Sequence, residues 1–237
     1  MENRKTEKKH TAIVLAAGKG SRMHSETPKQ FLELEGRPLV CYALQAFQES
    51  FIDEIILVTG EGQEDYCREE IVKRYGFTKV KQVIAGGKER YDSVYRGLCA
   101  AAPCDYVYIQ DGARPFLDEA LLLRAKACVE ESGACAAGMP VKDTIKTVDA
   151  DGVVRATPDR RLLWQIQTPQ VFSFPIIMEA YRQMFAAGAC EGITDDAMVA
   201  ERFSPVAVRL FEGSDRNIKI TTPSDLLVAK ILAENKF

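Results

Sequence analysis

The residues best suited to chemistry lie in a glycine-containing loop near the amino terminus. An apolar run leads into LAAGKGSRM, Leu15 to Met23, and Pro28-Lys29-Gln30 follows. Small residues directly after a buried strand let a ligand lie against the backbone, whose free N–H groups can bind phosphate oxygens. Arg22 and Lys29 add two cations nearby. This combination suits a triphosphate, although a plain strand-to-helix turn with solvated charges has the same pattern.

Two common phosphate-binding motifs do not fit. The dinucleotide fingerprint G-x-G-x-x-G requires a third glycine, but position 23 is Met, which argues against a dehydrogenase. The Walker A motif is approached at Gly87-Lys88, but Glu89 follows and position 82 is Gln. The loop therefore indicates a different class of nucleotide-binding protein.

A second candidate group is Gln110-Asp111-Gly112-Ala113-Arg114-Pro115, at the end of an apolar run. Ligands of open α/β sheets bind beyond the carboxyl ends of the strands. A carboxylate there can hold Mg²⁺, which typically binds one or two carboxylates together with substrate phosphates. Asp111 is therefore the candidate metal ligand, and Arg114 could bind a phosphate or a hydroxyl. The alternative is that Asp111 only caps a turn.

Four later polar strings are ordinary surface sequences when taken singly. Lys219 differs from the rest because it stands between Ile218 and Ile220, where a lone cation should face a ligand or a partner charge. An Asp-Asp pair more often caps a helix than binds a metal. The strings are Asp159-Arg160-Arg161, Gln167-Thr168-Pro169-Gln170, Thr194-Asp195-Asp196 and Asn217-Ile218-Lys219-Ile220-Thr221.

Alternating strands and helices must position these groups. Apolar runs predict strands over 11–17, 54–59, 80–85, 106–110, 134–140 and 206–211. Helical patterns cover 38–47, 63–75, 89–101, 117–132 (with Asp118 as N-cap), 175–187, 195–202 and 224–235. Nearly continuous apolar strands between helices predict an α/β fold with a mostly parallel sheet covered on both faces. We expect one domain over 11–237 after a disordered tail at 1–10.

The segment 141–155, VKDTIKTVDADGVVR, breaks this alternation. Its residues alternate around Asp151-Gly152, which is typical of a β-hairpin turn. A hairpin inserted in an α/β domain predicts a protruding arm at about 141–160. Because an isolated hairpin cannot bury both faces, we expect the arm to pack against a second subunit.

Composition excludes several classes. The formal net charge of −3 over 237 residues argues against a nucleic-acid binder. Seven scattered cysteines and only two histidines lack zinc-site spacing and predict buried, reduced thiols. No apolar run is long enough for a membrane span, and the charged amino terminus lacks a signal-peptide pattern. We therefore expect a cytoplasmic protein.

Taken together, the motifs resemble a known family. Nine motifs occur in a fixed order from Leu15 to Leu226: LAAGKGSRM, PKQF, GGKERYDSV, DGARPF, PVKDTIK, DR, QTPQ, TDD and NIKITTPSDL. The set is similar to the 2-C-methyl-D-erythritol 4-phosphate cytidylyltransferases, and it covers nearly the whole chain. The opening loop alone marks only the wider nucleotidyltransferase class. The resemblance implies a Rossmann-like nucleotidyltransferase fold, transfer of a cytidylyl group from CTP to a polyol phosphate, and Mg²⁺ as cofactor.

Ribitol-5-phosphate cytidylyltransferases are the alternative, because they share the opening, PKQ, RP, TPQ and NIK elements. Thr144 with Lys146, and Ala113 where ribitol enzymes tend to carry Val, favour the erythritol enzymes. Gly112 departs slightly, because Ala is commoner there in the family. A non-catalytic nucleotide-binding protein is a third alternative, but it would not need Lys29, Asp111 and Lys219 together.

The resemblance also implies roles for individual residues. The cytidine pocket would be lined by Ala16, Ala17, Gly18, Gly87 and Ser93. The triphosphate and the transition state would be held by Arg22, Lys29 and Lys219, with Mg²⁺ on Asp111. The polyol phosphate would contact Arg114, Thr144, Arg160, Thr168 and Thr194. In this family Thr144 and Arg160 would lie on or near an arm that reaches the other subunit of a homodimer.

Overall fold

A seven-stranded sheet forms the centre of the molecule in the computed structural model, which describes residues 7–18 and 27–234. Its strand order is β11-β7-β10-β6-β1-β4-β5. All neighbouring strands are parallel except that β10 runs antiparallel to β6 and β7. The strands are β1 (His10–Ala16), β4 (Glu54–Thr59), β5 (Val80–Ala85), β6 (Tyr106–Asp111), β7 (Ala134–Pro140), β10 (Trp164–Ser173) and β11 (Arg209–Glu212). The predicted mostly parallel α/β sheet is confirmed.

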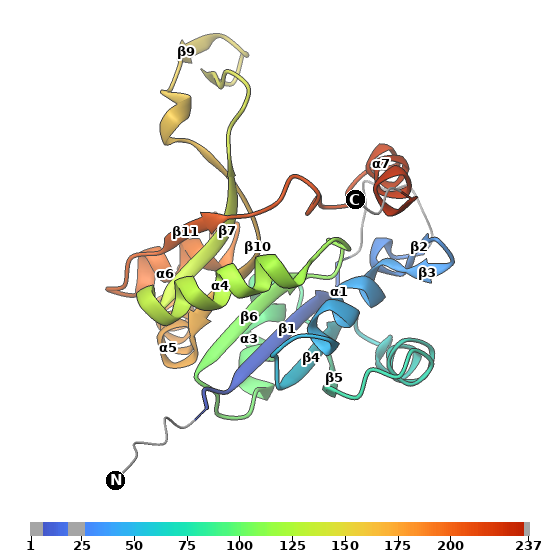
Figure 1. Ribbon diagram of the computed structural model, residues 1–237. Coiled ribbons are helices and arrows are strands. Elements are labelled where there is room, and N and C mark those ends of the chain that lie inside the picture. Colours follow the sequence, from blue (N-terminus) through green and yellow to red (C-terminus); the bar gives the residue numbers. More distant parts are fainter. Residues whose placement is uncertain (1–6, 19–26, 235–237) are drawn as a thin grey trace.

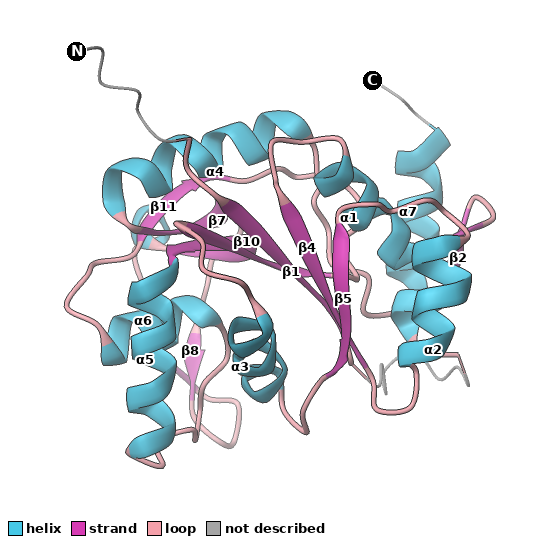
Figure 2. Cartoon of the chain, turned by 90° about the horizontal axis from the view of Figure 1, so that it is seen from below, coloured by secondary structure: helices cyan, strands magenta, loops and turns pink. Residues whose placement is uncertain are grey.

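Helices cover both faces of the sheet, as Figure 2 shows. Successive β1 residues point to opposite faces, so Ala12 and Val14 belong to one core while Ile13 belongs to the other. The first core is covered by α1 (Leu39–Gln48), α4 (Glu119–Ser132) and the π-helical turn η3 (Cys67–Lys73) that follows α2 (Glu64–Tyr66). The second is covered by α3 (Arg90–Ala100), α5 (Phe174–Ala186) and α6 (Asp196–Phe203).

A small third cluster lies where the chain ends beside an early hairpin. Short strands β2 (Glu33–Leu34) and β3 (Arg37–Pro38) pair around a turn in which Glu35 and Gly36 have positive φ. Helix α7 (Pro223–Glu234) packs against this hairpin through a cluster that contains Leu34 and Ala229. Figure 1 shows α7 above β2 and β3, far along the sequence but adjacent in space.

Strand β10 was not expected from the sequence. Its polar middle, Gln167 to Gln170, contains a proline, and proline normally argues against a central strand. The strand accommodates these residues because its register against β7 shifts between Ile166 and Gln170. Beyond the irregularity Val171 and Phe172 are fully buried and complete the two cores.

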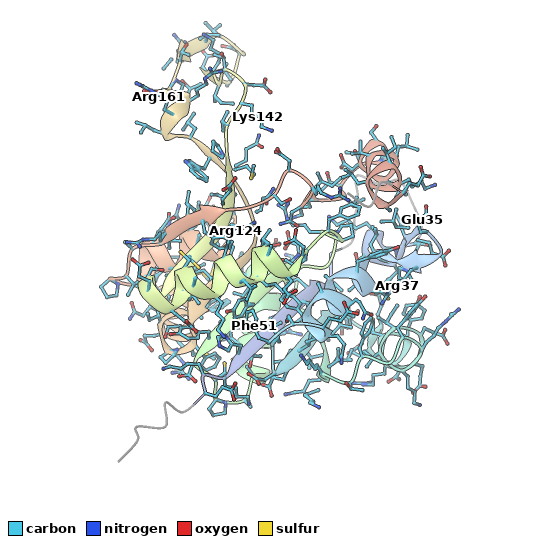
Figure 3. All side chains as sticks on the ribbon, in the orientation of Figure 1. Glu35, Arg37, Phe51, Arg124, Lys142 and Arg161 are labelled. Atoms are coloured by element: carbon cyan, nitrogen blue, oxygen red, sulfur yellow. The ribbon has the colours of Figure 1, made fainter. Side chains whose placement is uncertain are left out.

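The predicted arm is present between β7 and β10. Strands β8 (Thr147–Val148) and β9 (Val154–Ala156) form an antiparallel hairpin, followed by the 3-10 turn η4 (Arg160–Leu162). Gly152 has φ +81°, and the Asp149 carboxylate accepts hydrogen bonds from the backbone N–H groups of Asp151 and Val153 at 3.0 and 2.9 Å. The arm projects away from the sheet in Figure 1, and Lys142 and Arg161 are labelled on it in Figure 3.

Several sequence-based boundaries need correction. The late strand begins at Arg209 instead of 206, and the predicted helix over 63–75 is divided into α2 and η3. The ordered chain starts before residue 11, because Lys8 and Lys9 pair with Asp105 and Glu54 and His10 opens β1. All seven cysteines are free as expected, but only Cys41, Cys67 and Cys135 are buried; Cys99 is exposed and the other three are half-buried. Asp118 caps α4 as predicted, since its carboxylate accepts from Leu121 N at 2.7 Å.

Across the described ranges, no helix is both long enough and apolar enough to cross a membrane.

Candidate active site

A cleft of about 760 Å³ opens at the carboxyl edge of the parallel strands. The four segments that lead into it follow β1, β4, β5 and β6, which end beside Ala17, Gly60, Gly86 and Asp111. This edge is where open α/β sheets bind ligands. The fold therefore brings together residues from Leu15 to Lys219, which lie far apart in the chain.

One wall of the cleft is the Gly86-Gly87 turn before α3. A Cβ at Gly86 would lie 2.7 Å from both the Ala17 Cβ and the Ser93 Oγ, and a Cβ at Gly87 would overlap the Asp92 side chain. The Gly87 N–H donates to the Ser93 Oγ at 3.1 Å, and Arg96 donates to the Gly86 carbonyl at 2.8 Å. Only glycine allows this close approach, which leaves the turn backbone open to a ligand.

An adjoining wall is formed by the end of β1 and the segment around Lys29. Ala17, Gly18 and Lys29 line the cleft, whereas Ala16 is buried directly behind it. The Gln30 Nε2 donates to the Ala16 carbonyl at 2.5 Å and so ties the two segments together. Arg22, which the sequence analysis grouped with Lys29, lies outside the described residues.

Asp111 forms the charged centre of the cleft. Its Oδ2 lies 2.7 Å from the Lys219 Nζ, and its Oδ1 accepts from the Arg90 Nε at 3.4 Å. Burial alone would raise the pKa of Asp111, but the charges of Arg90 and Lys219 outweigh it and hold the pKa well below its usual value. Asp111 is therefore ionised, and its side chain faces cations instead of capping a turn.

Arg90 also binds a second carboxylate. Its Nη2 donates to the Asp196 Oδ2 at 2.7 Å, and the Asp196 Oδ1 accepts from the Tyr181 hydroxyl at 2.6 Å. Burial acts to lower the pKa of Arg90, but the two aspartates more than offset it and raise the pKa. The neighbouring Asp195 caps α6 by accepting from Met198 N at 2.9 Å, so the capping interpretation of the Asp-Asp pair is right for its first member.

Lys219 is positioned by its neighbours in the 217–220 segment. The Asn217 Nδ2 donates to the Thr168 carbonyl at 2.7 Å, and the Ile220 N–H donates to the Ala113 carbonyl at 2.9 Å. Between these two anchors Lys219 reaches into the cleft. The sequence expectation that this lone cation faces a partner charge is confirmed by Asp111.

Arg114 and Thr168 lie behind Asp111 and are both buried. The Thr168 Oγ1 accepts from Asp111 N at 3.1 Å, and the Arg114 Nη1 donates to the Asn217 carbonyl at 2.6 Å. Burial lowers the pKa of Arg114, an effect that the charge of Asp111 opposes. The Arg114 Nε has no hydrogen-bond partner among the described residues.

Six of the described predicted residues do not line this cleft: Ala16, Arg114 and Thr168 are buried, and the other three are exposed elsewhere. Thr144 and Arg160 are exposed on the arm, and the Arg160 Nη1 donates to the Lys142 carbonyl at 2.9 Å. Thr194 is exposed just before the α6 cap. Two residues later, Asp196 binds Arg90, which lines the cleft.

Sequence reasoning missed Arg90, Asp196 and Tyr181 as parts of the site. The available signal was the position of Arg90, at the start of a helix that is separated from the Gly86-Gly87 pair by two residues. Its partners could not be found in this way, because Tyr181 and Asp196 look like an ordinary core tyrosine and an ordinary helix-start aspartate.

The cleft suits a polyanionic ligand. Five cations line it, Lys29, Lys88, Arg90, Arg96 and Lys219, against three carboxylates, Glu61, Glu89 and Asp111. Neither histidine nor cysteine is among these lining residues, so the described walls contain no histidine-assisted nucleophile. Backbone turns and fixed cations are typical of enzymes that stabilise charge on phosphates.

Comparisons with known proteins agree with this architecture. The family model described as "IspD: 2-C-methyl-D-erythritol 4-phosphate cytidylyltransferase" matches residues 10–235. A 2-C-methyl-D-erythritol 4-phosphate cytidylyltransferase of Lachnospira eligens is 50% identical over 223 residues, 94% of this chain and 98% of that protein. The corresponding protein of Lachnoclostridium phytofermentans is 45% identical over 230 residues, 96% of this chain and 98% of that protein.

Solved structures are similar over the same length. The crystal structure of 4-diphosphocytidyl-2C-methyl-D-erythritol synthase from Anaerococcus prevotii superposes with a TM-score of 0.83 at 32% identity, over 96% of this chain and 97% of that one. The cytidylyltransferase of Thermus thermophilus gives a TM-score of 0.77 at 30% identity, over 94% and 98%. The chain belongs to the IspD family, the 2-C-methyl-D-erythritol 4-phosphate cytidylyltransferases of the non-mevalonate isoprenoid pathway.

Proposed function

We propose that the cleft at the carboxyl edge of β1, β4, β5 and β6 is the site at which this cytidylyltransferase acts, joining the cytidylyl group of CTP to 2-C-methyl-D-erythritol 4-phosphate. The observation that carries the proposal is the meeting of Asp111 with Lys219 and Arg90 beside two backbone-lined turns. One fixed carboxylate among cations, next to open backbone, is the arrangement that a metal-bound triphosphate requires.

The nucleotide would lie against the two glycine-containing walls. Gly87 and Ser93 of one wall and Ala17 and Gly18 of the other would line the base and ribose, and Ala16 is buried next to Ala17. A pyrimidine pocket closed by backbone would exclude a purine by size. Lys29, Lys219 and Arg22 would bind the phosphates.

Mg²⁺ is proposed as the cofactor, with Asp111 as its protein ligand. No cluster of three or more acidic, histidine or cysteine side chains suited to a metal occurs among the described residues. A site made by the protein alone is therefore not proposed. A single ionised carboxylate facing the phosphate region fits a metal that arrives with the nucleotide, since Mg²⁺ usually binds one or two carboxylates plus substrate phosphates. Bound there, Mg²⁺ would neutralise phosphate charge.

The proposed reaction is an in-line displacement at the α-phosphorus. An oxygen of the substrate's phosphate monoester forms the new bond to the α-phosphorus of CTP, and the bond to the β-phosphate bridging oxygen breaks to release pyrophosphate. The monoester is already anionic at neutral pH, so no general base is required. The barrier is dominated by repulsion between two polyanions, and Lys29, Lys219 and Arg22 lower it by stabilising the transition-state charge.

The polyol phosphate would bind at the Asp111 end of the cleft. Arg114, Thr168 and Thr194 are proposed ligands from the same subunit, and the buried, unpartnered Arg114 Nε supports a role as donor. Thr144 and Arg160 are proposed to reach the site of the partner subunit in a two-fold dimer. The exposed apolar side chains of the arm support this assembly, among them Val148, Val154 and Leu162.

We also propose that residues 11–237 act as a single domain and that the enzyme works in the cytoplasm. The three apolar clusters that join the sheet, its covering helices and α7 support the single domain. The scattered free cysteines support a reducing compartment.

Pyrophosphate release from CTP tests the proposal. We expect turnover with 2-C-methyl-D-erythritol 4-phosphate and little with ribitol 5-phosphate, or with ATP, GTP or UTP in place of CTP. Asp111→Asn should reduce the rate by about 100-fold or more, whereas Arg74→Ala, which removes an exposed ion pair with Glu70, should have no effect. Equal turnover with ATP, or a fully active Asp111→Asn enzyme, would refute the assignment.

A further inference from the structure

Arg90 joins two carboxylates that come from different parts of the fold. It is the first residue of α3, and it reaches Asp111 at the end of β6 through Nε and Asp196 at the start of α6 through Nη2. Asp111 and Asp196 are 21 and 106 residues away from it in sequence. A guanidinium is planar, so an arginine held at Nη2 also has its Nε direction fixed.

The Asp196 end of this bridge is rigid. Asp196 is fully buried, and Tyr181, also fully buried, donates to its other oxygen at 2.6 Å. Gln170 of β10 holds the surrounding turn, because its Nε2 donates to Asp195 at 2.9 Å and its Oε1 accepts from Ala197 N at 2.8 Å. Asp196 is therefore an anchor that does not need Arg90 to define its position.

The Asp111 end is less constrained by its own segment. Its Oδ2 is bound by Lys219, which is itself proposed to bind phosphate during the reaction. When Lys219 turns to the nucleotide, Arg90 is the remaining described side chain bonded to the Asp111 carboxylate. The distance from the Arg90 Nε to the Asp111 Oδ1 is 3.4 Å, longer than the 2.7 Å bond from Nη2 to Asp196. Arg90 therefore limits the rotation of the Asp111 carboxylate but binds its oxygen only weakly.

We infer that Arg90 is a positioning residue that transmits the rigidity of the buried Asp196–Tyr181 pair to Asp111 and so orients this carboxylate toward the metal. This inference rests on the proposed function, in which Asp111 binds Mg²⁺. Arg90 does not act on the reacting phosphates. The nucleotide wall is held by separate bonds from Ser93 and Arg96, so its geometry does not depend on Arg90.

The test compares Arg90→Lys with Tyr181→Phe. Lysine keeps the charge beside Asp196 but cannot bridge both carboxylates, so we expect the Mg²⁺ concentration for half-maximal rate to rise about tenfold and kcat to fall about tenfold, as for other residues that orient metal ligands. The KM for CTP should stay within about threefold of that of the unchanged enzyme, because the contacts that bind CTP equally in the ground state and the transition state are retained. Tyr181→Phe loosens the Asp196 anchor but leaves both Arg90 contacts, so its Mg²⁺ requirement should rise by less than that of Arg90→Lys.

Direct binding provides a readout other than activity. Electron paramagnetic resonance of Mn²⁺ in the presence of CTP should show about tenfold weaker binding to Arg90→Lys and a smaller loss of affinity for Tyr181→Phe. The double variant Arg90→Ala/Asp196→Asn, which leaves no unpaired buried charge, should show the same loss of Mn²⁺ affinity if Arg90→Lys fails to fold.

Four results would overturn the inference. The first is full Mn²⁺ affinity in both Arg90 variants. The second is a loss of Mn²⁺ affinity in Tyr181→Phe as large as that in Arg90→Lys. The third is a rise in the KM for the erythritol phosphate alone, which would make Arg90 a substrate ligand. In the fourth, Asp111→Asn binds Mn²⁺ normally, and the metal role of Asp111 falls as well. If Asp111→Asn loses Mn²⁺ affinity as expected but both Arg90 variants keep it, only the positioning role of Arg90 is refuted.

Discussion

The cleft and the arm are built in opposite ways. In the cleft and directly behind it, Asp111, Ser93 and Thr168 are at most 8% exposed, and Asp111 and Thr168 have hydrogen-bond partners from distant segments. On the arm, Val148, Val153 and Val154 are each 54% exposed and Leu162 is 81% exposed. The cleft is therefore organised within one chain, whereas the arm exposes apolar surface that a monomer has no reason to keep. This difference predicts that cleft variants damage chemistry and arm variants damage assembly.

The largest effect is expected at Lys29. Pro28 restrains the backbone before it, and Lys29 lines the cleft beside Gly18. We expect Lys29→Ala to lower kcat by about 100- to 1000-fold with a smaller rise in the KM for CTP, because the ammonium binds the transition state more strongly than the ground state. Lys29→Arg should rescue only in part, since a planar fork does not replace a compact ammonium.

Steady-state kinetics at saturating Mg²⁺ measure both constants for Lys29→Ala. A kcat within about threefold of the unchanged enzyme, less than 1 kcal/mol of barrier, would make Lys29 a solvated charge with no catalytic role.

Arg160 on the arm should have the next largest effect, and the effect should cross between subunits. Arg160→Ala removes a proposed ligand of the polyol phosphate, and we expect a loss of about 10- to 100-fold. Mixing Arg160→Ala with Lys29→Ala subunits should restore activity, because one site of each hybrid dimer combines an intact Lys29 with an intact Arg160. Random pairing makes half of the dimers hybrids, so about a quarter of the normal rate should return.

Refolding the two variants together and measuring pyrophosphate release tests this prediction. Each variant refolded by itself is the control. Complete absence of recovery in the mixture would show that Arg160 acts within its own subunit or not at all.

Assembly should depend on apolar side chains of the arm. We expect Leu162→Asp to weaken dimerisation by about 30-fold or more, because it would place a charge in a desolvated interface. Analytical ultracentrifugation measures the dissociation constant. Leu227→Asp on α7 is a matched control, since Leu227 is also apolar and 62% exposed but lies outside the arm. An equal effect of both substitutions would assign the interface to a different surface, and an unchanged dimer with Leu162→Asp would remove the arm from it.

The smallest effects are expected for alanine substitutions at two glycines, one in the cleft and one on the arm. Gly87→Ala forces its Cβ into Asp92 and disturbs the start of α3, so we expect the KM for CTP to rise about tenfold, roughly 1.4 kcal/mol. Gly152→Ala has open space around its Cβ but a φ of +81°, so it should cost about 1 kcal/mol of local strain and change kcat less than twofold. Kinetics and thermal unfolding of both variants distinguish the sites, and equal kinetic effects would contradict the contrast between cleft and arm.

Features that depend on residues close together in the chain could be predicted from the sequence, whereas features that depend on distant residues could not. Strands β4, β5 and β7 occur at their predicted bounds because a run of apolar residues is sufficient to define a buried strand. The hairpin turn at Gly152 and the cap at Asp118 were also predictable, since both depend on residues at most four positions apart. Strand β10 was missed because polar residues and a proline mask a pairing that only β6 and β7 stabilise.

The same distinction applies to the site. The residue types of the sequence were sufficient to predict a polyphosphate site with a metal at a sheet edge. They are small residues at the end of β1, a carboxylate at the end of β6 and a lysine between isoleucines. Only the tertiary structure decided that Lys219 and Arg90 share the Asp111 carboxylate and that buried Asp196 anchors Arg90. Local patterns are set by neighbours within a few residues, whereas these contacts follow from strand order, and the antiparallel insertion of β10 places α6 beside α3.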